Sequence, residues 1–330
     1  MKPDVTRGVD LTESAALYDR AVAAIAGGVT SARRRASAQD QLIYFDRGEG
    51  AYVWDVDGNR YLDYSLAFGS ALIGHASEVV RGAISTQLDR GLNFGAGHRL
   101  EVEAAELFCS IVPNAEQCLF ASTGTDVVLT ALRIARALTG RQKIIKMERS
   151  YHGAHDGVYV NVRDSGEMAD REHPFDPKPA SEGMSLGAVA DSLAAPYNDL
   201  EAVESLLSER GHEIAAVLVE PVQAETGYST PKPGYLEGLR RATRKAGTVL
   251  IFDEVITGFR LALGGGQEYF GVDADLATFG KAMGGTAAFS AVAGPRHMME
   301  PAAAHRAIHA GTFNANPLAC AAGIATRNRA

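Results

Sequence analysis

The 330-residue sequence contains little cysteine and no long apolar run. Cys109, Cys118 and Cys320 are the three cysteines, and they form neither a CxxC motif nor a Cys/His pattern typical of zinc ligands. Structural disulfides and a structural zinc site are therefore not expected. No run approaches the roughly 18 apolar residues of a membrane-spanning helix, and no amino-terminal stretch has the pattern of a signal peptide. We expect the cytoplasm as the location.

Positive charge is also scarce. The chain has 32 Lys and Arg against 40 Asp and Glu, which gives a net charge of -8 and a pI near 5.6. Such a balance argues against a general surface for nucleic acid or anionic membrane, apart from the local run Arg33 to Arg35. With 46% hydrophobic residues the chain can bury a large core in more than one lobe. These features favour an enzyme acting on small molecules.

The first part of the chain, residues 1–76, is predicted to be a small helical and antiparallel segment. Apolar residues recur at helical spacing between Leu11 and Ala26, and Gly27 and Gly28 follow them. Beyond this helix, residues 51–55 and 60–63 flank an Asp-Gly pair at 57 and 58, a strong hairpin signal.

From about Ser77 the pattern changes to helices that alternate with short apolar strands. Strands that are apolar throughout are typical of a sheet covered by helices on both faces. The fold class predicted is therefore α/β, with a mostly parallel sheet in a large cofactor-binding domain over residues 77–317. The strands expected from these runs are residues 117–121, 143–146, 214–219 and 248–252.

The segment from Ser122 to Asp126 lies between an apolar strand and a helix predicted over Val127 to Leu138. Small residues such as Thr123, Gly124 and Thr125 at a helix start leave backbone amides free to bind a phosphate. The same residues are also typical of a simple helix N-cap, and the segment alone does not separate the two interpretations.

Three further residues follow strands of the predicted sheet. Tyr151 could stack on a flat heterocycle or merely pack at a strand end, and His152 adjoins it. Glu220 ends the strand 214–219, where open α/β sheets place ligand groups, although it could equally bond nearby backbone amides.

Asp253 and Lys281 are 28 positions apart and carry the most specific signal. Asp253 completes a buried strand, so it needs a cationic partner or serves as a helix cap. Lys281 lies in a glycine-flanked apolar turn, where burial would lower the pKa of its amine and make it nucleophilic. An acid for a pyridine nitrogen and a lysine that forms an imine are what pyridoxal phosphate requires. The pair thus predicts this cofactor.

With these motifs assembled, the chain resembles the class III, fold-type I pyridoxal-phosphate aminotransferases, and within them the glutamate-1-semialdehyde 2,1-aminomutases. The resemblance runs from Ala26 to Pro317. It rests on three segments besides the cofactor motifs: residues 55–63 (DVDGNRYLD), 131–141 (ALRIARALTGR) and 253–260 (DEVITGFR). It implies a seven-stranded type of sheet.

The resemblance also implies roles for individual residues. Lys281 would be the imine lysine, Asp253 the partner of the pyridine nitrogen, and Val255 the residue packed on the second face of the ring. Thr312 matches a residue that reaches the cofactor phosphate of a neighbouring subunit, so a homodimer with shared sites is implied. The other assignments are Tyr151 for the ring face, His152 and Glu220 for cofactor contacts, Thr123 to Thr125 for the phosphate, and Ser31, Arg34 and Glu225 for the substrate.

Some features depart from the family pattern. Residues 122–127 read STGTDV, and the segment after Lys281 lacks a third glycine and a Leu-Pro pair. The chain also reaches Ala330 inside the helix begun after Pro317, so we expect residues 318–330 to begin a carboxyl-terminal small domain that this chain lacks.

The function predicted is amino transfer between an amino acid or amine and a keto acid or aldehyde. Ser31 and Arg34 favour an alternative, the intramolecular transfer of an aminomutase, whereas Glu225 favours the transferase. A third alternative of another class is a noncatalytic remnant that only binds the cofactor or dimerises.

Overall fold

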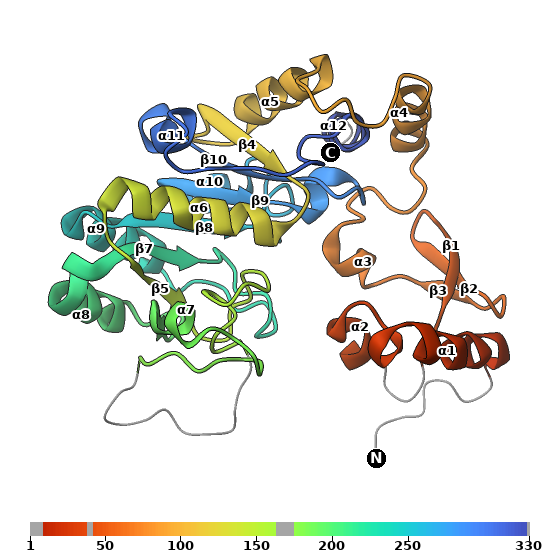
Figure 1. The fold of residues 1–330 in the computed structure, drawn as a ribbon, viewed down its shortest axis with the longest axis horizontal. Helices are drawn as coiled ribbons and strands as arrows, with labels where there is room; N and C mark the ends of the chain where they lie inside the picture. Colours follow the sequence, from red (N-terminus) through yellow and green to blue (C-terminus); the bar gives the residue numbers. More distant parts are fainter. Residues whose placement is uncertain (1–8, 38–41, 163–174, 329–330) are drawn as a thin grey trace. The chain divides into compact units, whose positions relative to one another are not determined.

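The computed structural model describes residues 9–37, 42–162 and 175–328, and it divides into two compact units, Met1–Glu78 and Val79–Ala330 (Figure 1). The boundaries expected at residues 76 and 317 remain a prediction. Residues 1–8, 38–41, 163–174 and 329–330 of the predicted segments lie outside the described part.

The first unit consists of short helices and a three-stranded antiparallel sheet with the order β1-β2-β3. Its elements are α1 (Thr12–Ala24), η1 (Ala26–Gly28), α2 (Ala32–Ser37), β1 (Phe45–Glu49), β2 (Tyr52–Asp55), β3 (Arg60–Leu62) and α3 (Leu66–Gly69). The predicted hairpin is β2 and β3, and Gly58 in its turn has a φ of 88°. The carboxylate of Asp57 in this turn accepts hydrogen bonds from the amides of Glu13 and Ser14 at 2.6 and 3.1 Å. The turn thus caps the first turn of α1.

The second unit contains a seven-stranded sheet with the order β4-β10-β9-β8-β7-β5-β6. Its strands are β4 (Gln117–Ala121), β5 (Lys143–Met147), β6 (Ser192–Ala195), β7 (Ile214–Val219), β8 (Val249–Glu254), β9 (Leu276–Phe279) and β10 (Ser290–Gly294). Strands β6, β5, β7, β8 and β9 pair in parallel, whereas β10 is antiparallel to both β9 and β4. The mostly parallel sheet expected from the apolar runs is therefore confirmed.

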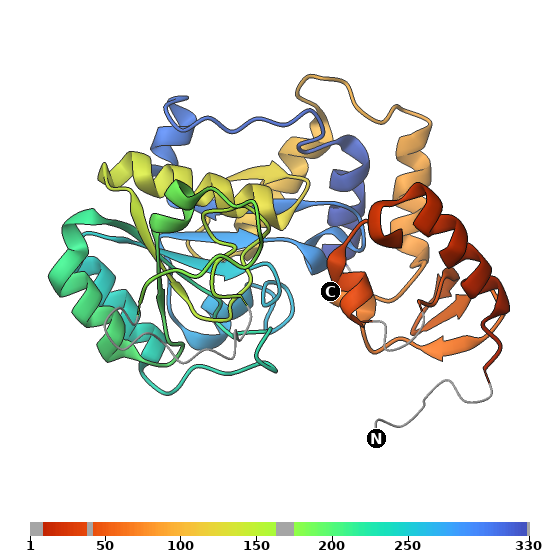
Figure 2. The same ribbon diagram turned by 60° about the horizontal axis from the view of Figure 1, so that its bottom comes forward.

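Helices cover both faces of this sheet (Figures 1 and 2). Helix α6 packs against β4, β7, β8, β9 and β10 on one face, whereas α9 packs against β8 on the other. The helices of the unit are α4 (Glu78–Leu88), α5 (Arg99–Ile111), α6 (Gly124–Thr139), α7 (Leu186–Ala190), α8 (Leu200–Arg210), η2 (Gly211–Glu213), α9 (Tyr235–Ala246), α10 (Gly265–Phe270), η3 (Lys281–Gly284), α11 (Arg296–Ala303) and α12 (Pro317–Arg327).

The core on the α6 face is aliphatic, and its centre is formed by buried residues such as Leu132, Ile144 and Ile251. An aromatic cluster lies around Phe108 of α5, whose ring is 5.1 Å from Phe279 and 6.3 Å from Phe120. Both clusters remove large apolar side chains from water, which supplies most of the driving force for folding.

Some helices and strands have the bounds expected from the sequence, and others begin or end at different residues. The bounds of β4 and β7 match the expected runs, but α6 begins three residues earlier than predicted, at Gly124. Asp253 was expected to complete this strand, and β8 runs one residue further, to Glu254, so the acid is its penultimate residue. Strands β6, β9 and β10 were not predicted, because short runs rich in alanine carry little strand signal.

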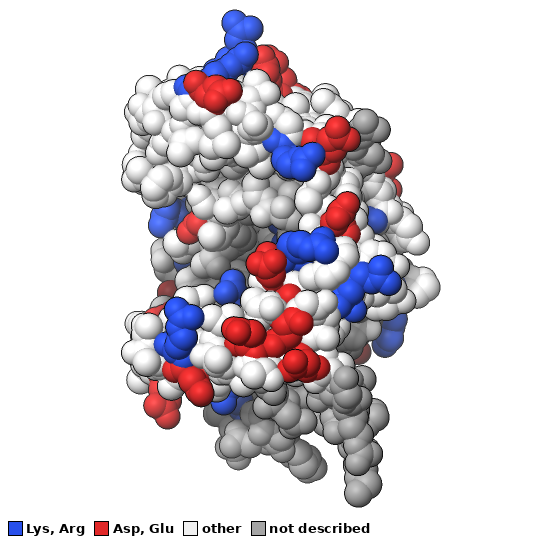
Figure 3. Space-filling view, turned by 90° about the vertical axis from the view of Figure 1, so that its right-hand side faces the viewer, with Lys and Arg blue, Asp and Glu red and all other residues white. Residues whose placement is uncertain are grey.

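Two surface features bear on the expected partners. Among residues 9–37, 42–162 and 175–328, no helix is long and apolar enough to cross a membrane. On the face drawn in Figure 3, acidic and basic side chains are interspersed.

Candidate active site

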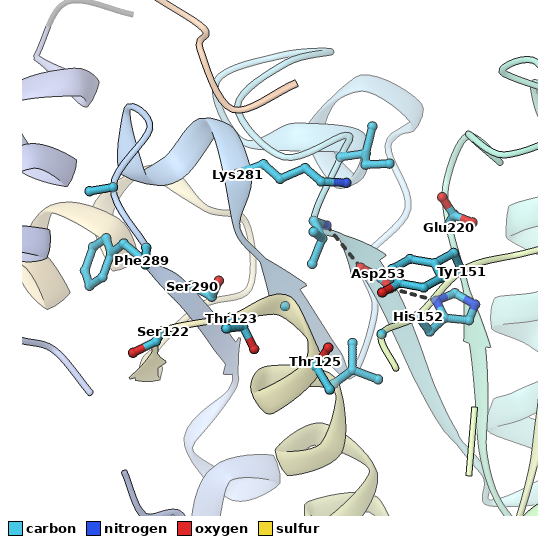
Figure 4. Close-up of a pocket in the computed structure, with 17 residues that line it drawn as sticks. Ser122, Thr123, Thr125, Tyr151, His152, Glu220, Asp253, Lys281, Phe289 and Ser290 are labelled. Atoms are coloured by element: carbon cyan, nitrogen blue, oxygen red, sulfur yellow. Dashed lines mark hydrogen bonds and ion pairs between the residues drawn. The ribbon is translucent and has the colours of Figure 1, made fainter. Parts of the chain in front are cut away.

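A cavity of about 260 Å³ lies at the edge of the sheet where strands β5, β7, β8 and β9 have their carboxyl ends (Figure 4). Parallel strands bring residues that follow different strands to one edge, which is where open α/β sheets bind ligands. The lining residues are Ser122, Thr123, Gly124, Thr125, Val128, Tyr151, His152, Gly153, Glu220, Asp253, Val255, Ile256, Lys281, Ala287, Ala288, Phe289 and Ser290.

Asp253 is buried in β8 with a side chain that is 4% exposed. Its Oδ2 atom lies 2.6 Å from Nδ1 of His152. Its Oδ1 atom accepts hydrogen bonds from the amide of Val255 at 3.1 Å and the hydroxyl of Thr278 at 3.2 Å. These partners fix the orientation of the carboxylate and stabilise its charge in a poorly hydrated place.

His152 is buried, and burial lowers the pKa of its imidazole below the ordinary value of 6.5. A neutral ring that donates from Nδ1 to Asp253 carries its single proton on that nitrogen. The other nitrogen, Nε2, is also buried and has no hydrogen-bond partner among the residues that the structure describes. His152 therefore supports the acid as a neutral donor.

Glu220 follows β7 and is 3% exposed. Burial, together with the nearby charge of Asp253, raises the pKa of the Glu220 carboxyl to about 8. Its Oε2 atom accepts a hydrogen bond from the amide of Ala224 at 3.2 Å, whereas Oε1 has no partner within the described part of the chain. At pH 7 Glu220 is thus mainly a neutral carboxylic acid that can donate a hydrogen bond into the cavity.

The start of helix α6 forms one side of the cavity. Thr123 is the N-cap, and its hydroxyl oxygen accepts a hydrogen bond from the amide of Asp126 at 3.3 Å. The capping interpretation is therefore confirmed, and the phosphate interpretation remains compatible with it. We call the predicted phosphate site, Thr123 to Thr125, the phosphate cup. A side chain at Gly124 would lie 3.2 Å from Val255, so these two residues meet closely beneath the cup. The helix dipole and free amides make this end attractive to an anion.

The loop after β5 approaches the same helix start. Gly153 has a φ of 103°, and a side chain there would lie 2.7 Å from the hydroxyl of Thr125. The Thr125 hydroxyl also accepts a hydrogen bond from the amide of Ala154 at 3.3 Å. Glycine at position 153 thus lets the loop carrying Tyr151 and His152 pack against the predicted phosphate cup.

Lys281 begins the short helix η3, and Gly280 alone separates it from β9. Its backbone is left-handed, with a φ of 45°, a conformation that costs energy for a residue with a side chain. Figure 4 shows its amine extending into the cavity, with Asp253, Tyr151 and Glu220 on one side and Thr123 and Thr125 at the helix start.

The loop that carries Tyr151 is held from below by a buried lysine. Nζ of Lys146 in β5 donates hydrogen bonds to the carbonyl oxygens of Ser150 and Val160 at 2.8 and 2.5 Å. Burial lowers the pKa of Lys146 to about 7. Gln223 donates to the Glu148 carbonyl at 2.5 Å and to the Ser150 hydroxyl at 3.0 Å. The loop before Tyr151 therefore has little freedom.

The cavity collects most, though not all, of the residues predicted from sequence. Glu225 lies in the turn after Glu220 and Thr312 in an exposed loop, and neither lines the cavity. The Thr312 carbonyl accepts a hydrogen bond from Asn93 at 3.0 Å. Ser31 and Arg34 belong to the other compact unit, where Arg34 donates to the Thr30 hydroxyl at 3.2 Å.

Several lining residues were not predicted. Ser122 immediately precedes the predicted cup, and Ser290 begins β10 opposite Ala121 of β4. Phe289 adjoins Ser290 and lies 4.7 Å, ring to ring, from Phe120. The sequence signal for Ser290 is a hydroxyl at the start of a short strand, but the sequence pattern does not predict the strand β10 itself.

Comparisons with known proteins agree with this geometry. The family described as aminotransferase class-III matches residues 34–328. The glutamate-1-semialdehyde 2,1-aminomutase of Chloroflexus aggregans is 44% identical over 317 residues, which are 96% of this chain and 71% of that protein.

Solved structures are also similar. An omega-transaminase from Sphaerobacter thermophilus superposes with a TM-score of 0.92 at 34% identity, covering 99% of this chain and 74% of that one. A structure described as a transaminase with PLP bound has a TM-score of 0.88 at 33% identity, covering 96% and 73%. The chain therefore belongs to the class-III aminotransferase family.

Proposed function

We propose that this chain transfers an amino group between an amino acid or amine and a keto acid or aldehyde, with pyridoxal 5'-phosphate held in the cavity. The observation that carries the proposal is that one cavity joins Lys281, the buried acid Asp253 and the start of α6. Few other cofactors require an amine, a buried carboxylate and an anion site together.

The cavity fits the cofactor at each of its ends. The amides at Gly124 and Thr125 offer a place for the phosphate, because neither glycine nor a short hydroxyl side chain blocks the helix start. Two buried polar atoms, Nε2 of His152 and Oε1 of Glu220, have no partner among the described residues and leave hydrogen-bonding capacity for a ligand.

The bound cofactor supplies an electron sink that stabilises negative charge at the reacting carbon of the substrate. Asp253 would keep the ring nitrogen protonated, and His152 would hold Asp253 in place. Tyr151 and Val255 would enclose the two faces of the ring. Lys281 would hold the cofactor covalently until a substrate amine releases it, and its amine would then carry a proton to and from the substrate carbon.

The remaining assignments concern substrate and assembly. Ser31, Arg34 and Glu225 are proposed to contact the substrate. For Arg34 the reason is that its guanidinium matches a substrate carboxylate. Thr312 is proposed to reach the cofactor phosphate of a second copy in a homodimer, which is compatible with its exposure. The three free thiols favour a cytoplasmic location.

The second candidate is the intramolecular amino transfer of an aminomutase. The similarity to proteins named glutamate-1-semialdehyde 2,1-aminomutase favours it. The two reactions differ in one respect: a transferase releases a keto product before a second substrate enters, whereas a mutase returns the amino group to a neighbouring carbon of the same substrate.

Reduction with borohydride tests the cofactor site directly. Treatment of the pyridoxal-phosphate-loaded protein should attach the cofactor permanently to the peptide that contains Lys281, as found by peptide mass mapping. Lys281→Ala should abolish the attachment, whereas Lys245→Ala, an exposed lysine in α9, should not change it. Attachment elsewhere, or equal labelling of Lys281→Ala, would reject the assignment.

A single-turnover assay then separates the functions. A panel of amino donors without any keto acid should yield up to one keto product per site in a transferase. An isomerised amine without keto product would indicate the mutase, and no spectral response to any amine would indicate the noncatalytic remnant.

A further inference from the structure

A second cavity, of about 470 Å³, lies between α5, the edge strand β4 and α11. It shares none of its lining residues with the active-site cavity. Its residues are Ala105, Glu106, Cys109, Glu116, Gln117, Cys118, Leu119, Met299, Ala302, Ala303 and His305, and we call it the thiol groove.

Two of the three cysteines meet in this groove. Cys109 lies in α5 and Cys118 in β4, and α5 packs against β4. Both side chains are partly exposed free thiols. Because α5 packs against β4, both thiols line the same groove, and each thiol shifts the pKa of the other.

The two thiols differ in reactivity. Interaction with the Cys118 thiol, aided by the charge of Arg296, lowers the pKa of the Cys109 thiol. The same interaction, with burial, raises the pKa of Cys118. Because the thiolate is the nucleophile, Cys109 is suited to attack a disulfide first. Cys118 is suited to attack the Cys109 sulfur of the resulting mixed disulfide. Burial raises the pKa of Cys320 to about 12, which makes that residue inert.

We propose that Cys109 and Cys118 are a dithiol site that reduces low-molecular-weight disulfides which enter the thiol groove. The Cys109 thiolate attacks one sulfur of the disulfide, forms a mixed disulfide and releases one thiol. Cys118 then attacks the Cys109 sulfur, gives its proton to the leaving thiolate, and releases the second thiol. The protein is oxidised by two electrons, and the small disulfide is reduced to two thiols.

The product is a covalent link between α5 and β4. Ser122 and the start of α6 directly follow β4, so the link lies on the strand that leads into the predicted phosphate cup. The groove also contains Glu106, Glu116 and His305, and attack is faster at higher pH because the thiolate fraction of Cys109 rises.

Oxidised glutathione is a suitable probe, and mass spectrometry is the readout. The wild-type chain should lose two hydrogens and yield a peptide pair joined through Cys109 and Cys118. Cys118→Ser should instead stop at one glutathione on Cys109, because the second thiol is absent. Cys109→Ser should react roughly tenfold more slowly or not at all. Cys320→Ser serves as the matched control and should behave as the wild type.

Three results would overturn the proposal. One is a wild-type chain that keeps glutathione on Cys109 without forming the internal disulfide. Another is equal labelling of Cys118 in Cys109→Ser. The third is a failure of phenylarsine oxide, which bonds two neighbouring thiols with release of water, to bind the wild type more tightly than either single variant. This last measurement is made on the reduced protein and does not depend on amino transfer.

Discussion

Nδ1 of His152 lies 2.6 Å from Oδ2 of Asp253, and both side chains are buried. The histidine follows β5 and the acid lies in β8, 101 positions further along the chain. Because burial lowers the pKa of His152, the ring is a neutral donor and leaves the negative charge of Asp253 available to a cationic ligand.

Removal of this donor should weaken cofactor binding. His152→Leu deletes the hydrogen bond to a buried carboxylate, so we expect the affinity for pyridoxal phosphate to fall roughly tenfold to a hundredfold. His152→Asn, which retains a short donor, should recover part of the loss. Equilibrium dialysis measures both, and wild-type affinity in His152→Leu would refute the role.

Glu220 should make stability fall as the pH rises between its ordinary pKa of 4.5 and its folded pKa of about 8. Its folded pKa of about 8 lies above the ordinary value of 4.5, so the native state retains a proton that the unfolded chain loses. The contribution of Glu220 to the free energy of unfolding is therefore largest at low pH and is lost as the pH rises through about 8. Between pH 6 and 8 the loss is roughly 2 kcal/mol.

Urea unfolding at a series of pH values isolates this contribution. Glu220→Gln keeps the neutral shape and should remove the downward slope, so the difference in unfolding free energy between the two proteins changes with pH. Lys146 contributes the opposite slope from about pH 7 upward, since its folded pKa of about 7 lies below its ordinary value of 10.5, so the two contributions overlap only near pH 7 to 8. Parallel curves for the wild type and Glu220→Gln would contradict the prediction.

Lys146 should restrain the loop that carries Tyr151. Lys146→Met leaves the carbonyls of Ser150 and Val160 without this donor. Amide hydrogen exchange in residues 148–161 should then accelerate by roughly tenfold or more. Lys143→Met is the matched control, because Lys143 lies on the same strand and donates to the exposed Ala190 carbonyl. Equal exchange in both variants would mean that Lys146 does not hold the loop.

Arg327 is a buried charge that should cost stability. Its guanidinium lies between 5.8 and 5.9 Å from the ring centres of Phe108, Phe259 and Phe289. Neither Nη atom has a hydrogen-bond partner in the described part of the chain, and burial lowers the pKa of this group to about 10.

We expect Arg327→Leu to raise the unfolding free energy by about 1 to 4 kcal/mol, because a buried ion is replaced by an apolar side chain. Arg327→Lys should lower it, since the planar contact with the rings is lost while the charge remains. Denaturant unfolding decides the sign, and a destabilised Arg327→Leu would show that the guanidinium contributes favourably.

Local patterns in the sequence were sufficient for much of the site. Lys281 and Asp253 were recognised because each adjoins a short apolar run, and Thr123 to Thr125 because helix starts have a characteristic composition. Continuous apolar runs also predicted β4 and β7, since strands covered on both faces need no polar alternation.

Contacts between distant segments were beyond the reach of these patterns. The pairing of His152 with Asp253 and the hydrogen bond from Gln223 to the Glu148 carbonyl depend on which strands are neighbours. The placement of Cys109 and Cys118 in one groove depends on which helix covers β4. Residue types and local periodicity thus specified the chemical groups, whereas their partners and protonation follow from burial and strand order. The physical reason is that a pKa or a hydrogen bond depends on atoms in contact, and a single chain's local pattern does not say which residues of remote segments touch.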